Sequence, residues 1–189
     1  DGAQGNSYAN QSYGTYHSYL QTAIDSVEAN FDAGILLNLV EHDNATQQFE
    51  LGYLLSESEL NLSDTELNTG YSTLSSIGQV SSISPATFAE VIRGYGSLGS
   101  FLFGASYNGY TFNAVPRVDA PTVSSDQYFS GGYTLTTYGK ERWGEINAIE
   151  VATPYSGFRD NANAYRAVGV VLEEATKNFY QEHTGISLY

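Results

Sequence analysis

The stretch Ile35-Leu36-Leu37-Asn38-Leu39-Val40 is a short apolar segment that follows Gly34 and is bounded by polar residues. A segment of this kind predicts a buried strand of the type found inside parallel sheets. Residues 145–153, Glu-Ile-Asn-Ala-Ile-Glu-Val-Ala-Thr, predict a second strand much later in the chain. Two such strands, widely separated in sequence, indicate a sheet whose connections contain helices.

Two long helices are predicted from the spacing of apolar side chains. In residues 15–31 these side chains recur at steps of three and four, which is typical of one face of an amphipathic helix. The same spacing occurs in a helix expected to begin near Asp160 and to stop by Gly185. The first stripe comprises Tyr16, Leu20, Ile24, Val27 and Phe31, and the second comprises Tyr165, Val168, Leu172, Ala175 and Phe179.

Shorter elements complete the predicted order. We expect helices over 85–93 and 97–103, a strand over 110–115, and a long loop or hairpin over 116–144, where glycines mark turns. No internal repeat or domain boundary is visible. The pattern predicts one α/β domain over residues 1–189, with a mixed sheet and helices on both faces.

Charge and composition narrow the classes of partner. The chain has 189 residues, 21 acidic and 7 basic, for a net charge of −14, and its first 92 residues contain no Lys or Arg. A phosphate backbone would be repelled, so we expect no nucleic acid partner. No apolar stretch approaches the roughly 20 residues of a transmembrane helix, so no membrane span is expected. The acidic half is either a solvated face or a face that binds cations or a partner.

Several features favour an extracellular protein. The absence of cysteine excludes disulfides and thiol chemistry, and the absence of methionine in a chain starting at Asp1 indicates a processed product. Asn10, Asn44 and Asn61 each begin an N-x-S/T sequon. Three sequons in 63 residues predict a secreted glycoprotein with N-linked glycans. The alternative is a bacterial or cytosolic protein that is simply rich in Asn, Ser and Thr.

An ordered set of short motifs resembles one family. These motifs are Glu50-Leu-Gly-Tyr-Leu-Leu55, Ser75-Ser-Ile77, Arg93-Gly94 followed by Ser97-Leu-Gly99, Phe129-Ser-Gly-Gly-Tyr133, and Gly157-Phe-Arg-Asp160. Together they resemble the C-terminal portion of secreted N-formylglutamate amidohydrolase-like proteins, which are relatives of the zinc carboxypeptidases. The resemblance covers almost the whole chain. It implies a zinc-exopeptidase-like fold that lacks its N-terminal strands.

The chain departs from this family at the positions that perform the chemistry. The family's zinc-binding histidine corresponds to Val40, whose isopropyl group cannot coordinate a metal, and a supporting aspartate corresponds to Asn38. The family's general base corresponds to Ala152, whose methyl group cannot accept a proton. Glu150 lies on the same face of the strand and could stand in, from a position about 6–7 Å away.

Besides Glu150, six residues are candidates for binding. His42 keeps a family position and is either a structural hydrogen-bonding residue or a weak zinc ligand candidate. Arg159 matches a family arginine, and it either binds a carboxylate in bidentate fashion or forms a structural salt bridge. Tyr133, in a Gly-Gly-Tyr loop, suits an interface, glycan stacking or ordinary packing. Glu50 lies close in sequence to Glu41 and Asp43, and these carboxylates could offer oxygen ligands to calcium, although their spacing matches no known loop.

These observations lead to an expected function and two alternatives. The expected function is that of a secreted, glycosylated pseudoenzyme without a cofactor, acting as a structural or binding protein. Its open sheet edge would pair with an N-terminal fragment of the same precursor or with another copy. The first alternative is a zinc-dependent amidohydrolase or carboxypeptidase-like enzyme completed by a second chain. The second is a carboxylate or glycan binder that reuses the old substrate pocket.

Overall fold

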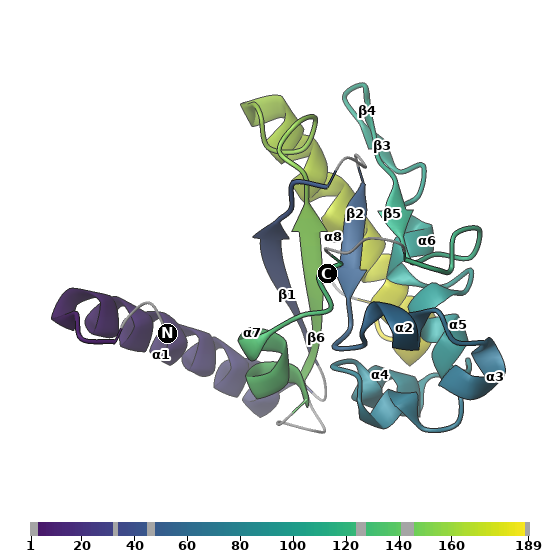
Figure 1. Ribbon diagram of the computed structural model, residues 1–189, viewed down its shortest axis with the longest axis horizontal. Helices are drawn as coiled ribbons and strands as arrows, with labels where there is room; N and C mark the ends of the chain where they lie inside the picture. Colours follow the sequence, from purple (N-terminus) through teal and green to yellow (C-terminus); the bar gives the residue numbers. More distant parts are fainter. Residues whose placement is uncertain (1–3, 32–33, 45–47, 124–127, 141–145, 188–189) are drawn as a thin grey trace.

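The protein has an α/β fold built on a four-stranded mixed sheet (Figure 1). The computed structural model describes residues 4–31, 34–44, 48–123, 128–140 and 146–187. The strand order is β1 (Gly34–Glu41), β6 (Ile146–Thr153), β2 (Phe49–Gly52) and β5 (Ala114–Val115). β1 runs parallel to β6, β6 antiparallel to β2, and β2 parallel to β5. The predicted α/β class and mixed sheet are thereby confirmed.

Strands β1 and β6 match their predicted ranges to within one residue at each end. All eight residues of β6 are buried, and all eight pair with β1, from Gly34–Ile146 to Glu41–Thr153. The expectation that β1 lies inside the sheet was wrong, because β1 is an edge strand and Leu39 is 63% exposed. Apolar composition predicts burial of a strand's faces but does not determine whether a neighbour lies on both of its edges.

Helices pack against both faces of the sheet. On one face, α8 (Ala162–Thr184) shares the main core with Ile149 and Val151 of β6. On the other, called the front face, Ile24 of α1 (Ser7–Asn30) and Tyr138 pack against Ile146. Tyr138 belongs to η2 (Thr136–Lys140), a single π-helical turn that follows α7 (Tyr133–Leu135). The helical cover of the front face therefore lies at the amino-terminal ends of β1 and β6.

Helix α1 is longer and more exposed than predicted. It begins at Ser7, after an Asn6 cap, rather than near residue 15, and its outer part projects away from the sheet (Figure 1). Of the predicted apolar stripe, Ile24 is buried whereas Tyr16 and Phe31 are exposed. In α8 the predicted stripe is correct at Leu172, Ala175 and Phe179 but wrong at Tyr165, which is exposed. Periodicity defines a face of a helix, and the neighbouring elements decide how much of that face is covered.

The segment between β2 and β5 consists mainly of short helices. These are α2 (Glu57–Leu60), α3 (Asp64–Leu67), η1 (Tyr71–Thr73), α4 (Gly78–Ile83), α5 (Phe88–Arg93) and α6 (Leu98–Leu102), followed by the hairpin of β3 (Ser106–Tyr107) and β4 (Tyr110–Thr111). Helices α2, α3 and α5 each begin with a capping box, in which a Ser or Thr side chain and a Glu three residues later satisfy each other's backbone N–H groups.

Three local predictions need correction in this region. The strand expected over 110–115 is divided between β4 and β5, because Phe112 and Asn113 turn the chain between two different partners. Pro85 lies outside α5, whose N-cap is Thr87. Of the long loop or hairpin expected over 116–144, the loop is found at 116–123 and 128–132, whereas residues 133–140 form the helical turns α7 and η2.

Gly52 provides a test of the packing on the front face. A Cβ at this position would lie 2.3 Å from the carbonyl oxygen of Phe129, so Gly52→Ala must displace backbone. We expect a loss of stability of roughly 1–3 kcal/mol or more in chemical denaturation. Gly169→Ala in α8 is the matched control, because its Cβ would contact nothing within 4 Å. It should gain roughly 0.5–1 kcal/mol from helix propensity. Equal effects of the two substitutions would contradict this packing.

Candidate functional site

The carboxyl-terminal half of the front face contains the residues singled out by the sequence. Val40 pairs with Ala152 in the β1–β6 register, and Asn38 pairs with Glu150. Because side chains alternate along a strand, all four lie on the same face of the sheet. The site therefore places an isopropyl and a methyl group side by side, next to one carboxyl group and one amide.

Glu150 is held in a poorly solvated position. Its side chain is 6% exposed, and its Oε2 accepts a hydrogen bond of 2.9 Å from Asn38 Nδ2. Burial raises the pKa of the Glu150 carboxyl, and the Asn38 hydrogen bond partly opposes that rise. The carboxyl group thus retains its proton to a higher pH than an exposed glutamate.

A second carboxyl group, Glu50 of β2, lies on the same face. Glu50 pairs with Ala152, so it is a diagonal neighbour of Glu150 on the adjacent strand. It is 2% exposed, and its Oε1 accepts a hydrogen bond of 2.7 Å from Asn44 Nδ2. Its Oε2 is buried and has no hydrogen-bond partner among the described residues. The structure separates Glu50 from Glu41, which faces the other way and pairs with Arg159.

The hydroxyl of Tyr128 anchors this residue to strand β2. It donates a hydrogen bond of 2.6 Å to the carbonyl oxygen of Leu51. Burial is the largest cause of the raised pKa of Tyr128, followed by the charges of Tyr53, Glu50 and Glu150. This hydrogen bond therefore joins Tyr128 to a strand that lies 77 residues earlier in the sequence.

His42 has a structural role at the end of β1. The imidazole is buried, and its Nε2 lies 3.0 Å from the carbonyl oxygen of Gln48, to which it donates. Its Nδ1 accepts a hydrogen bond of 3.2 Å from the backbone N–H of Asn44. Both ring nitrogens are thus engaged in the neutral form, which favours the structural interpretation of His42 over the metal ligand.

Arg159 and Tyr133 do not join this group. Arg159, after the carboxyl end of β6, forms a salt bridge of 2.9 Å with Glu41 and donates to the carbonyl oxygen of Pro154. Tyr133, in α7, stacks edge-on against His17 of α1, with 5.4 Å between ring centroids. Arg159 follows the carboxyl end of β6, whereas α7, which contains Tyr133, lies near the amino end of that strand (Figure 1). The described residues therefore do not bring Arg159 and Tyr133 into one pocket.

The three sequons differ in their surroundings. Asn10 is exposed on α1. The Asn44 amide nitrogen donates to Glu50, and residue 46, which completes this sequon, lies outside the described residues. The Asn61 amide exchanges two hydrogen bonds with the backbone of Val123, at 2.9 and 3.0 Å. Of these sites, Asn10 is the one whose modification leaves the described hydrogen bonds of the fold intact.

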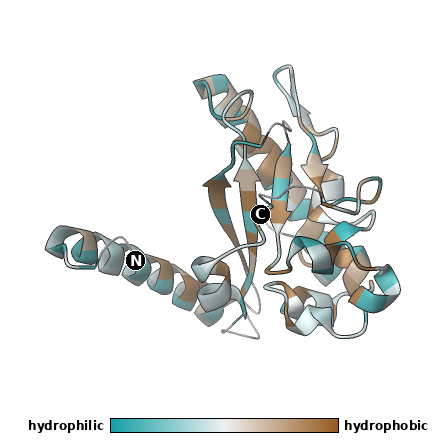
Figure 2. Cartoon of the chain, in the orientation of Figure 1, coloured by the Kyte–Doolittle hydropathy of each residue, from teal (hydrophilic) through white to brown (hydrophobic). Residues whose placement is uncertain are grey.

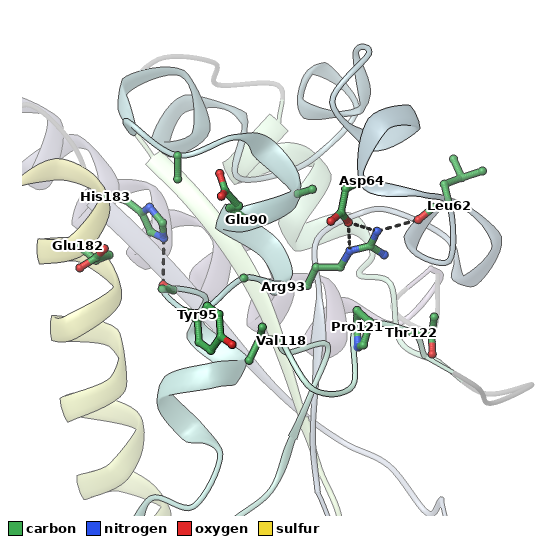
Figure 3. Close-up of a pocket in the computed structure, with 14 residues that line it drawn as sticks. Leu62, Asp64, Glu90, Arg93, Tyr95, Val118, Pro121, Thr122, Glu182 and His183 are labelled. Atoms are coloured by element: carbon green, nitrogen blue, oxygen red, sulfur yellow. Dashed lines mark hydrogen bonds and ion pairs between the residues drawn. The ribbon is translucent and has the colours of Figure 1, made fainter.

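A separate cavity of about 520 Å³ lies between α5 and the end of α8 (Figure 3). Arg93, on its wall, donates hydrogen bonds to Asp64 and to the carbonyl oxygens of Leu60 and Leu62. His183 donates from Nε2 to the carbonyl oxygen of Gly96 and accepts from Ser84 at Nδ1. Burial lowers the pKa of His183, which favours the neutral imidazole at this helix end. Both basic side chains are already satisfied by the fold.

Comparisons with known proteins give no family to which the chain can be assigned. No family model, no curated protein and no solved structure matched it. Among the described residues, no group of three or more His, Cys, Asp or Glu side chains is placed to hold a metal ion. Within the same residues, no helix combines the length and the apolar character that a transmembrane span requires.

Glu150→Gln tests the cost of burying this carboxyl group. The pKa of Glu150 is raised in the folded state, so its favourable contribution to stability is present at acidic pH and is lost as pH rises through the folded pKa. Glutamine keeps an acceptor for Asn38 without the charge. We expect the variant to be more stable than the wild type at pH 7 by on the order of 1 kcal/mol.

The measurement is urea denaturation in chelator-containing buffer across pH. The gain should shrink as pH falls and disappear below about pH 4, where the wild-type carboxyl group is also protonated. Glu173→Gln is the control, because Lys177 lowers the pKa of the exposed Glu173 and the variant should not gain stability at pH 7. A pH-independent difference between Glu150→Gln and the wild type would contradict the assignment.

Proposed function

We propose that this chain is a secreted, glycosylated and non-catalytic relative of the N-formylglutamate amidohydrolase-like proteins, acting as a structural or binding protein. The observation that carries the proposal is the pairing of Val40 with Ala152. Where the resemblance calls for a zinc-binding histidine and a general base, the chain has two adjacent alkyl groups. Neither can bind a metal or accept a proton.

The neighbouring polar residues also support a non-catalytic function. Glu150, the possible substitute base, is held by Asn38 and desolvated, and the two ring nitrogens of His42 are occupied by backbone groups. The alternative enzyme, completed by a second chain, would need that chain to supply both the missing ligands and a base. A zinc-exopeptidase-like arrangement lacking its N-terminal strands remains part of this proposal.

The test is hydrolysis of N-formyl-glutamate and related N-acyl amino acids by the purified chain with added zinc chloride. We expect no zinc-dependent turnover, because the two alkyl positions remove the metal ligand and the base together. Glu150→Gln is assayed in parallel, to separate activity of this site from a contaminating hydrolase. Zinc-dependent turnover that is lost in Glu150→Gln would overturn the proposal and favour the two-chain enzyme.

The surface formed by β1 and α1 supports a binding function. β1 is an edge strand without Lys, Arg or Pro, the residues that commonly protect such edges. Figure 2 shows that β1 is predominantly hydrophobic. Residues 7–24 of α1 contain no Asp, Glu, Lys or Arg. The absence of charge is notable because this segment meets solvent, with Tyr8 82% exposed. Because this surface is nearly uncharged, a second copy could pair with it despite the net charge of −14.

Leu39→Lys tests this pairing by placing a charge on the exposed face of the β1 edge strand. We expect the wild type to elute as a dimer or larger assembly in size-exclusion chromatography with light scattering, and Leu39→Lys to elute as a monomer. Leu74→Lys, at another exposed leucine outside the sheet, is the control and should assemble like the wild type. A monomeric wild type would contradict self-assembly. The partner of the β1 edge strand would then have to be a different chain, such as a precursor fragment.

A further inference from the structure

The free edge of β1 presents the backbone of every second residue. The N–H of His42 donates to the carbonyl oxygen of Thr153 at 3.0 Å, and the carbonyl oxygen of Val40 accepts from the Thr153 hydroxyl at 3.4 Å. The backbone groups of the even-numbered residues therefore face β6. Because this direction alternates along a strand, the N–H and C=O groups of residues 35, 37 and 39 point away from β6. Among the described residues, no strand pairs with them on that side.

An apolar groove lies beside the amino-terminal end of this edge. It has a volume of about 630 Å³ and is formed by the end of α1, the start of β1 and the carboxyl-terminal part of α8. Ile35 lines it together with Phe31 and Ile186, which are 65% and 47% exposed. Leu39, four residues further along β1, shares a face with Ile35 and is itself exposed. The groove and the exposed leucine thus lie on one face of one strand.

Helix α1 extends beyond the same edge. Its carboxyl-terminal part packs on the front face through Ile24, whereas its amino-terminal part leaves the sheet on the side of β1 (Figure 1). The projecting residues 7–19 include no Asp, Glu, Lys or Arg, and Tyr19 among them is 73% exposed. The described helices over the front face lie at the amino-terminal ends of β1 and β6, away from Val40.

We propose that two copies of this chain pair through their β1 strands, antiparallel about a two-fold axis at Leu37, so that Leu39 of each copy enters the groove of the other. This inference rests on the self-assembly in the proposed function and specifies its partner and register. Leu37 lies opposite its counterpart, and Ile35 of one copy lies opposite Leu39 of the other. Each pair joins residues whose backbone groups point outward, so each can exchange two hydrogen bonds. The axis makes one edge complementary to itself.

Charge and strand length favour this register over its two neighbours. Only outward-facing residues pair through hydrogen bonds, so the residue opposite Ile35 must be odd-numbered. If it were Glu41, a second carboxyl group would enter a groove that Glu28 already lines. If it were Leu37, then Leu39 would extend past the first residue of the other copy's β1. Leu39 opposite Ile35 avoids both outcomes and buries an exposed leucine.

The same axis accounts for the projecting helix. The second copy's β1 runs in the opposite direction, so the carboxyl-terminal half of its front face lies beside the amino-terminal end of the first copy's β1. Residues 7–19 of α1 leave the sheet at that end and would lie over this half, which contains Asn38 and Val40 (Figure 1). Because these residues of α1 lack Asp, Glu, Lys and Arg, a second chain of net charge −14 can cover them without close repulsion.

The chain has no cysteine, so single-cysteine variants report the register directly. The two copies of residue 37 would have Cα atoms about 5.5 Å apart, within the range of a disulfide. Those of residue 39 would be offset by four residues along the strand, about 14 Å. Under mild oxidation with copper phenanthroline, we expect Leu37→Cys to form a covalent dimer roughly tenfold or more faster than Leu39→Cys. Leu74→Cys, exposed outside the sheet, is the control and should not cross-link.

A second measurement leaves Leu37 unchanged. A mixture of Ile35→Cys and Leu39→Cys proteins should cross-link faster than either protein alone, because residue 35 of one copy lies opposite residue 39 of the other. Non-reducing electrophoresis measures the covalent dimer, and light scattering under reducing conditions gives the mass of each variant and of the wild type.

The outcomes separate this inference from the proposed function. A wild-type dimer in which Leu37→Cys and Leu39→Cys react at equal rates, with no gain in the mixture, would overturn the register and leave self-assembly standing. A wild-type dimer in which none of the β1 cysteines cross-links would overturn pairing through β1. A monomeric wild type without cross-linking in any variant would overturn self-assembly as well. None of these results depends on the hydrolysis test.

Discussion

The parallel pairing of β1 with β6 is the constraint on which the rest of the structure depends. It joins segments that are more than a hundred residues apart in sequence, and it does so over eight consecutive residues. Because side chains alternate along each strand, this register fixes at once which residues meet α8 and which lie on the front face. The placement of Asn38, Val40, Glu150 and Ala152 on one face is a consequence of that alignment.

Close backbone contacts then fix the loops over the sheet. Gly52 allows the chain at Phe129 and Ser130 to lie directly on β2, and Gly139 allows η2 to lie against Ala148, whose Cβ would be 2.6 Å from an added methyl group. These two contacts bring Phe129, Ser130 and η2 onto the front face. Glycine here serves close approach of backbone rather than chain flexibility.

The front face combines features that stability alone would not favour. Two glutamates are buried there on adjacent strands, whereas the cavity beside α5 has its arginine and histidine fully satisfied by the fold. Residues that lower stability without a local compensation are common at functional sites. The proposed non-catalytic function also concerns this face, where it depends on Val40 and Ala152.

The sequence by itself determined the α/β class, the ranges of β1 and β6, and the two long helices, because hydrophobic periodicity is a local property of the chain. The capping boxes that begin α2 and α3 are also local signals, formed by Ser56 with Glu59 and by Ser63 with Glu66. Only the tertiary structure decided that β1 is an edge strand, that much of α1 is exposed, and that Glu50 lies beside Glu150 rather than beside Glu41. Those relationships follow from strand order and register. Both depend on the pairing of distant segments, so neither can be recognised from the sequence of one segment alone.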